Sequence, residues 1–206
     1  MIIPGIVAHT IVAAGGPAAG DYSFQEGVDG YTGNIDNRID GDNATTNYST
    51  DDTLDVDDNN FPLMKWDVSS LEGGTVSAAD ITVAVSNGGG NGAANVVELF
   101  EMLRDWVEDE STWNIYSTGN DWGTAGATHA DDSGTTALFS DNMASTGATT
   151  MTLNASGIAV VQKWLDNAAD NHGLIMRHNG STNKMFYRSA KWATATIRPQ
   201  LNITIA

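Results

Sequence analysis

The stretch Ile81-Thr82-Val83-Ala84-Val85 decides the fold class, because strongly apolar side chains occupy every second position along it. This alternation is typical of a strand that buries one face of an antiparallel sheet. The same period recurs in the short segments 54–56, 64–68 and 201–205. Segments rich in Gly and Asn separate these runs and favour turns. The pattern predicts an all-β protein, either a sandwich or a barrel.

One segment departs from this pattern and predicts a single short helix over 155–166. Ile158, Val161 and Leu165 recur at helical spacing, and Asn154 or Ser156 is available as the N-cap.

Charge and cysteine content narrow the range of partners. The chain has 206 residues, no Cys and a net charge of −17. A protein this acidic repels nucleic acid phosphates and anionic membrane surfaces. We therefore expect no nucleic acid partner and no membrane partner. The absence of Cys excludes a disulfide framework and thiolate metal sites.

The first twenty residues carry no charge and are rich in Gly, Ala, Ile and Val. They lack the positive region of a signal peptide, and no apolar run is long enough to span a bilayer. We expect residues 1–30 to form an extended N-terminal arm, used for assembly or as an added edge strand, ahead of a domain at 31–206. A loose leader is the alternative. The candidate assembly residues are Ile2, Ile3, Ile6, Val7, Ile11 and Val12.

Cations concentrate near the C-terminus. Six of the nine fall between 163 and 198: Lys163, Arg177, Lys184, Arg188, Lys191 and Arg198. They form either ordinary solvated surface or a mildly basic face that docks onto an acidic neighbour, such as another copy of this chain.

A set of short motifs occurs in a recognisable order along the chain. They are Asn47-Tyr48-Ser49, Trp66-Asp67-Val68-Ser69, Ala78-Ala79-Asp80-Ile81, Trp106 to Trp113, Ser156 to Trp164, Asn171 to Met176 and Arg198 to Ile205. In this order they resemble the DNRLRE family of extracellular β-sandwich modules, over roughly residues 35–206. The resemblance implies a jelly-roll-like antiparallel sandwich. It also implies a strand within 95–106, where propensity alone favours a helix.

Members of that family occur in secreted enzymes, cell-surface proteins and virion proteins, and some related modules bind acidic polysaccharides such as alginate. This chain departs from the family pattern at two positions. Lys65 stands near the place of an Arg that usually leads the second strand, and Ala190 follows the Phe-x-Ser segment where a Glu is usual. Any function that depends on an Arg–Glu pair is therefore in doubt.

The opening Ile3-Pro4-Gly5-Ile6-Val7-Ala8 is similar to the start of many tailed-phage virion proteins. This resemblance implies an arm that holds the chain in a virion.

No catalytic residues stand out in the sequence. The four His residues show no metal-ligand spacing, and no nucleophile-elbow motif is present. Calcium is a possible structural cofactor, because oxygen donors crowd into 36–58. The candidate ligands are Asp40, Asp42, Asp51 and Asp52, and the alternative is a solvated acidic loop with Asx turns.

Aromatic side chains provide candidate glycan contacts, because they can stack on sugar faces. Trp113, Tyr116 and Trp122 flank the Gly-rich loop 117–135, although packing in a core or an interface suits them equally. Trp66, Trp106 and Trp164 lie on patterned segments, and we expect them in the core.

Two functions remain open. The first is a non-enzymatic decoration or fibre protein of an extracellular assembly, most simply a virion surface, whose partners are its own copies or other structural proteins. The second is a carbohydrate-binding module that serves adhesion on a cell-surface polysaccharide or accompanies a polysaccharide-degrading enzyme.

Overall fold

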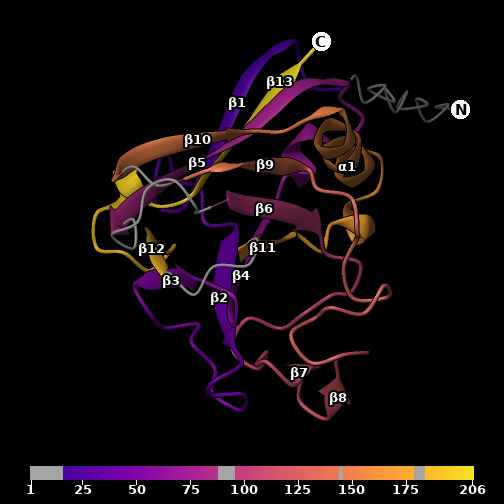
Figure 1. The fold of residues 1–206 in the computed structure, drawn as a ribbon. Coiled ribbons are helices and arrows are strands. Elements are labelled where there is room, and N and C mark those ends of the chain that lie inside the picture. Colours follow the sequence, from indigo (N-terminus) through magenta and orange to yellow (C-terminus); the bar gives the residue numbers. More distant parts are fainter. Residues whose placement is uncertain (1–15, 88–95, 144–145, 179–183) are drawn as a thin grey trace, which may run out of the picture.

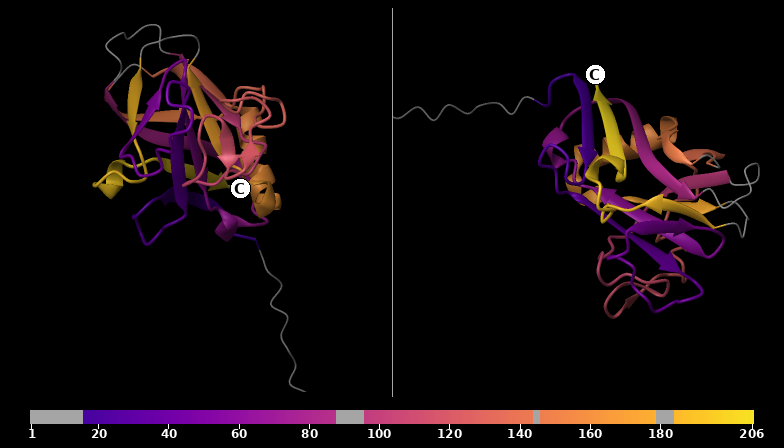
Figure 2. Two further views of the ribbon diagram at one scale, coloured as in Figure 1. Left: turned by 90° about the horizontal axis from the view of Figure 1, so that it is seen from below. Right: turned by 90° about the vertical axis from the view of Figure 1, so that its left-hand side faces the viewer.

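The computed structural model describes residues 16–87, 96–143, 146–178 and 184–206. Two antiparallel sheets pack face to face as a sandwich, with one helix at the side and a small hairpin apart from both sheets (Figures 1 and 2). The prediction of an all-β antiparallel sandwich with a single short helix is confirmed.

Sheet A, as we call the first, has six strands. They are β1 (Gly20–Gln25), β3 (Thr53–Val56), β5 (Val76–Asn87), β10 (Gly147–Thr152), β12 (Met185–Arg188) and β13 (Gln200–Ile205). The long strand β5 pairs with β10 on one side, and with both β13 and β12 on the other. Strand β1 lies at the edge, where Gly20 pairs with Ile205 of β13.

Sheet B has five strands in the order β2-β4-β11-β6-β9. Their bounds are β2 Asn34–Asp40, β4 Asn60–Trp66, β11 Leu174–His178, β6 Val96–Glu101 and β9 Phe139–Asn142. The predicted strand within 95–106 is therefore confirmed as β6. Strands β7 (Ile115–Ser117) and β8 (Asn120–Asp121) form the separate hairpin.

The main core lies between the two sheets and follows the period-two pattern. Ile81, Val83 and Val85 of β5 face Met64 and other apolar side chains of sheet B. The expected core tryptophans are confirmed as buried, with Trp66, Trp106 and Trp164 at most 3% exposed.

A second apolar cluster covers the other face of sheet B. Phe61 and Leu63 of β4, together with Ile175 of β11, pack under Met102 and Trp106. Strand β4 is thus buried on both faces, and this explains why apolar residues run through it almost without interruption.

Helix α1 (Ala155–Asp166) has the predicted bounds, and of the two candidate caps, Asn154 and Ser156, it uses Asn154. The Asn154 side chain accepts hydrogen bonds from the backbone N–H groups of Ser156 and Gly157, at 2.9 and 3.1 Å. Three short 3₁₀ helices complete the described elements: η1 (Ser69–Leu71), η3 (Ala168–Asp170) and η4 (Ala195–Ile197). Within the described ranges, no helix is long and apolar enough to cross a membrane.

The six candidate assembly residues between Ile2 and Val12 lie outside the described residues. Strand β1 begins at Gly20 and joins sheet A, so part of the range 1–30 belongs to the sandwich itself. The remainder of the predicted arm stays a prediction.

Candidate functional site

Strands β12 and β13 follow nearly one line along the same side of β5. Strand β12 pairs at Tyr187 with Val85, and β13 begins to pair at Gln200 with Thr82. Between these two points the chain leaves the sheet through residues 189–199, which we call the excursion. On this side of β5, Val83 and Ala84 have no partner in either strand pairing.

A cleft of about 260 Å³ lies where the excursion leaves the sheet. Its floor is β5, and its walls come from β12, the excursion, β13, β1 and the start of β10. The lining residues are Gln25, Thr82, Val83, Ala84, Val85, Ser86, Gly147, Ala148, Arg188, Thr196, Ile197, Arg198 and Gln200. Hydroxyl, amide and guanidinium groups thus surround an apolar floor, and this combination suits a ligand with both polar and apolar faces.

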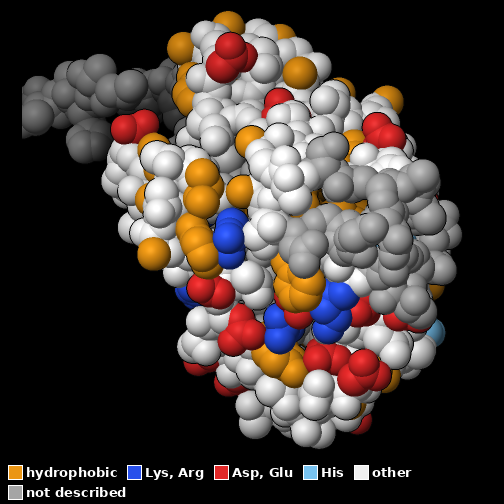
Figure 3. Space-filling model, turned by 60° about the vertical axis from the view of Figure 1, so that its left-hand side comes forward, with side chains coloured by type: hydrophobic (Ala, Val, Ile, Leu, Met, Phe, Trp, Pro, Cys, Tyr) orange, Lys and Arg blue, Asp and Glu red, His pale blue; other side chains and the backbone are white. Residues whose placement is uncertain are grey.

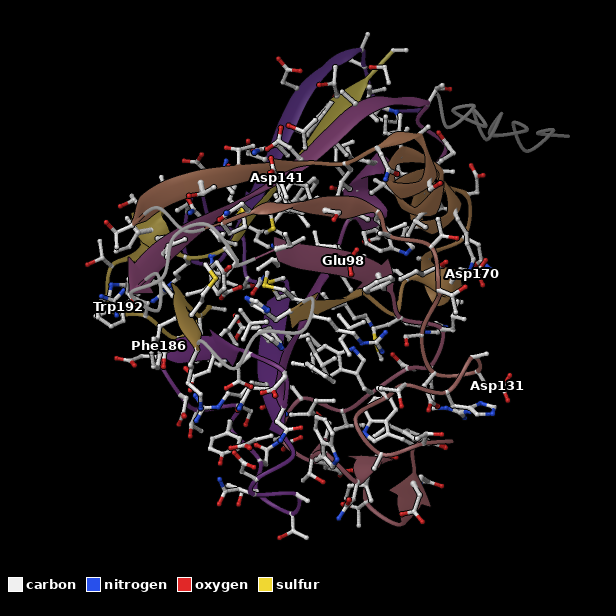
Figure 4. All side chains as sticks on the ribbon, viewed as in Figure 1. Glu98, Asp131, Asp141, Asp170, Phe186 and Trp192 are labelled. Atoms are coloured by element: carbon white, nitrogen blue, oxygen red, sulfur yellow. The ribbon has the colours of Figure 1, made fainter. Side chains whose placement is uncertain are left out.

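Arg188 ends β12 at one side of the cleft. Its guanidinium carbon lies 3.4 Å from the ring centroid of Trp192 in the excursion, which is a close cation–π contact. Trp192 is half-buried and lies with Phe186 at one side of the molecule (Figure 4). The stack fixes the direction of the guanidinium, and its hydrogen-bond donors meet no acceptor among the described residues.

Arg198 lies at the other side of the cleft and connects the excursion to the residue that follows β1. Its Nε donates to the Trp192 carbonyl at 2.6 Å, and its Nη1 donates to the Glu26 carbonyl at 3.1 Å. Both acceptors are neutral, so they orient the cation without cancelling its charge.

Arg177 does not line the cleft and donates to the Ala127 carbonyl and the Ser133 hydroxyl. The three lysines near the C-terminus differ from Arg188 and Arg198. Lys163, Lys184 and Lys191 all bind carboxylates, with Lys163 Nζ lying 2.9 Å from Glu101 and Lys191 Nζ 2.7 Å from Glu108. Arg188 and Arg198 form no salt bridge among the described residues, which include every Asp and Glu of the chain. In a protein of net charge −17, two cations without carboxylate partners at one cleft form an unusual local site.

The side of the molecule that carries β3 and β12 is turned forward in Figure 3. Lys and Arg side chains gather in its middle, between hydrophobic and acidic ones. The sequence analysis grouped the 163–198 cations but did not single out Arg188 and Arg198, because only the pairing along β5 brings them to one cleft.

The three predicted glycan-contact residues lie elsewhere, at the hairpin end of the molecule. Trp122 is 4% exposed and its Nε1 donates to the Thr112 carbonyl at 2.9 Å, so its ring faces the protein. Trp113 and Tyr116 are half-buried, and Trp113 packs against Phe61 with ring centroids 5.2 Å apart. These two remain candidate contacts, while Trp122 serves packing.

The four candidate calcium ligands are spread over two regions. Asp40 is 5% exposed and accepts from the Asp42 backbone N–H at 2.8 Å and from the Tyr48 hydroxyl at 3.0 Å. Those hydrogen bonds lower the Asp40 pKa against the opposing effect of burial. Asp51 instead pairs with Arg38 at 3.2 Å, and Asp52 is exposed.

Within the described ranges, no three Asp, Glu or His side chains are placed to hold a metal ion together. Asp40 and Asp57 follow the Asx-turn pattern, in which a carboxylate accepts the backbone N–H two residues on, here from Asp42 and Asn59. Calcium binding therefore stays a prediction, and melting with and without a chelator tests it.

Comparison with known proteins adds one finding. Residues 31–131 match the family model described as carbohydrate-binding module family 96. The match spans β2 to β8, whereas the partners of β5 in sheet A all lie beyond it. No curated protein matches the sequence. The chain therefore contains a carbohydrate-binding-module-like domain, and the folded sandwich extends beyond the matched residues.

Proposed function

We propose that this protein is a non-catalytic carbohydrate-binding module that holds a polysaccharide in the cleft of the excursion. The observation that carries the proposal is the pair formed by Arg188 and Arg198, which flank the cleft without carboxylate partners. The family match over 31–131 supports sugar as the ligand class.

The chemistry of the cleft favours a polysaccharide that carries acidic groups, such as alginate. A planar guanidinium can donate two parallel hydrogen bonds to one carboxylate. The amides of Gln25 and Gln200 and the hydroxyls of Thr82 and Ser86 add donors and acceptors for sugar hydroxyl groups. The apolar floor suits the C–H face of a sugar ring. The overall charge of −17 opposes an acidic chain at long range, so recognition depends on these short contacts.

Binding of alginate and of a neutral glucan, measured by isothermal titration calorimetry, tests this proposal. Arg188→Ala should weaken alginate binding about tenfold or more, because it removes a charge-assisted contact worth about 1.5–3 kcal/mol. Arg188→Lys should recover only part of the loss, because an ammonium lacks the planar fork.

Lys163→Ala is the matched control, because it removes one positive charge from α1, where Lys163 pairs with Glu101. If Arg188→Ala and Lys163→Ala bind alginate equally well, the cleft is not the site. If neither alginate nor the neutral glucan binds the intact chain, the proposed function is wrong for these ligands.

The prediction of a role in a virion or another surface assembly depends on Ile2 to Val12, which the described ranges do not include. The solution mass of the full chain and of the chain that lacks residues 1–20 tests it. An assembly that disappears with the arm would support a structural role in addition to sugar binding.

A further inference from the structure

A second pocket lies at the end of the sandwich where β2 begins and β4 ends, and it shares no lining residue with the cleft. We call it the end pocket. Its lining residues are Gly33, Ile35, Lys65, Asp67, Val68, Ser69, Trp164, Ala168 and Asn171. Five separate elements contribute to it: β2, β4, η1, α1 and η3.

The size of the end pocket fits a single six-membered ring. Its volume is about 150 Å³. A buried cavity of about this size in another protein accommodates benzene. Because the end pocket is open on one side, the substituents of a larger ring can project into solvent. This size and opening suit a free ring or the last ring of a chain.

The lining has an apolar wall and a polar rim of mixed charge. The apolar lining residues are Ile35, Val68 and Trp164, of which Val68 and Trp164 are at most 2% exposed. Lys65 supplies a cation and Asp67 a carboxylate at the rim. An anionic ligand would meet Asp67 and a cationic one would meet Lys65. Neutral hydroxyl groups suit both, because each hydroxyl can donate as well as accept.

The polar groups are held in place before any ligand arrives. Lys65 Nζ lies 2.9 Å from Asp105 Oδ1, which fixes one of its donors and leaves others free. Asp67 Oδ1 accepts from the Ser69 backbone N–H at 2.9 Å. The hydrogen bonds from Ser69 lower the pKa of Asp67, so its carboxylate stays ionised at neutral pH. Groups that are already ordered lose little entropy when a ligand binds.

We propose that the end pocket binds one neutral pyranose ring, either as a free monosaccharide or as the terminal residue of a chain. The ring would lay a C–H face against the apolar wall and direct its hydroxyl groups to Lys65 and Asp67. The inference rests on the proposed function only in the choice of sugars as ligands. It requires no contribution from Arg188 or Arg198.

The test uses the full chain in ¹⁵N NMR titrations with glucose, galactose, mannose and N-acetylglucosamine. The indole N–H signal of Trp164 reports on the end pocket, and that of Trp192 reports on the cleft. A sugar of this size is expected to bind with a dissociation constant in the millimolar range. At least one sugar should therefore shift the Trp164 signal saturably and leave Trp192 unchanged.

Ala168→Phe should abolish this shift, because a large side chain would fill the mouth of the end pocket. Ala169→Phe is the matched control, since Ala169 is the exposed neighbour and does not line the end pocket. Lys65→Met offers a second variant that adds no bulk, with Lys163→Met as its charge control. Lys65→Met should weaken binding about tenfold.

Arg188→Ala separates this inference from the proposed function, because it should leave the Trp164 shift intact. A saturable Trp164 shift that Ala168→Phe removes and Ala169→Phe retains supports the end pocket even if the cleft binds nothing. The inference is overturned if no sugar of the panel shifts Trp164 saturably, or if Ala168→Phe and Ala169→Phe respond alike.

Discussion

The Oδ2 atom of Asp36 accepts the backbone N–H of Ala190 at 2.6 Å and thereby joins strand β2 of sheet B to the start of the excursion. Asp36 is 1% exposed. Its own backbone N–H donates to Glu108, which also binds Lys191 of the excursion. One buried carboxylate and one half-buried carboxylate therefore hold the wall of the cleft in place.

The stability of the protein should fall as pH rises from about 4 to about 7 because of Asp36. Burial raises the Asp36 pKa from 3.8 to about 7, against the opposing effect of the Ala190 hydrogen bond. In this range the unfolded chain releases the proton while the folded chain keeps it, so the free energy of unfolding decreases. The shift corresponds to a change on the order of 4 kcal/mol.

Asp36→Asn should remove this pH dependence, because the amide stays neutral and can still accept from Ala190. Urea denaturation of both proteins at pH 4, 6 and 8 measures it. Asp109→Asn, at an exposed position, is the control and should keep the wild-type profile. A profile of Asp36→Asn parallel to that of the wild type would contradict the assignment.

Gly173→Ala should destabilise the fold strongly. Gly173 has φ of +80°, and a Cβ there would collide with the Met64 carbonyl oxygen and lie 2.8 Å from the Lys65 Cβ. Gly119 has nearly the same φ, +78°, and no atom lies within 4 Å of the place that its Cβ would take. Gly119→Ala should therefore cost only the backbone term of about 1–2 kcal/mol. Thermal melting should show that Gly173→Ala loses at least about 2 kcal/mol more stability than Gly119→Ala. Equal losses in the two variants would refute the collision.

Arg38→Met should cost about 1.5–3 kcal/mol, because it removes charge-assisted hydrogen bonds to two carboxylates and leaves Asp55 with Lys184 alone, whose Nζ lies 3.6 Å away. Arg38 lies 2.9 Å from Asp55 and 3.2 Å from Asp51, and the Asp55 side chain is 7% exposed. Chemical denaturation measures the loss. Adding Asp55→Asn to Arg38→Met should recover part of it by removing a buried charge that only Lys184 would still face. No recovery in the double variant would mean that Arg38 acts mainly through packing on Tyr48.

Asn154→Ala should lower stability by about 1–2 kcal/mol through loss of the α1 cap. Asn154→Ser keeps an acceptor for the first turn but loses the hydrogen bond that the Asn154 amide donates to the Ala137 carbonyl. If capping dominates, the serine variant should melt close to wild type. If the two variants lose the same stability, the Ala137 contact is the more important one.

Local sequence signals predict the elements well where they are strong. Helix α1 combines apolar side chains at helical spacing with a capping Asn154, and both its bounds and its cap are confirmed. The strand β6 lies where local propensity favours a helix, because Val97 and Leu99 can fill the sandwich core only from an extended chain. There the tertiary packing overrides the propensity.

The cleft could not be predicted from the sequence, because it depends on where two strands stop pairing with a third. The sequence around Gln200 and Tyr187 does not indicate that these two residues pair with Thr82 and Val85 of β5. The cation-rich segment 163–198 was visible, yet its lysines bind acids that are distant in sequence, while Arg188 and Arg198 do not. Trp122 likewise could not be separated from Trp113 by sequence, because burial depends on how the loop folds.

The pairing of Gly20 with Ile205 gives the sandwich a directional resistance to force. A pull applied through these two residues would separate β1 from β13 one residue pair at a time, since the load falls on the outermost hydrogen bonds first. If a ligand in the cleft is pulled while Ile205 is held, the force acts instead along β13 and its pairing with β5. All the residue pairs between these two strands are then loaded together. The domain should therefore unfold at low force when it is pulled through Gly20 and Ile205, and at higher force when it is pulled through a ligand in the cleft.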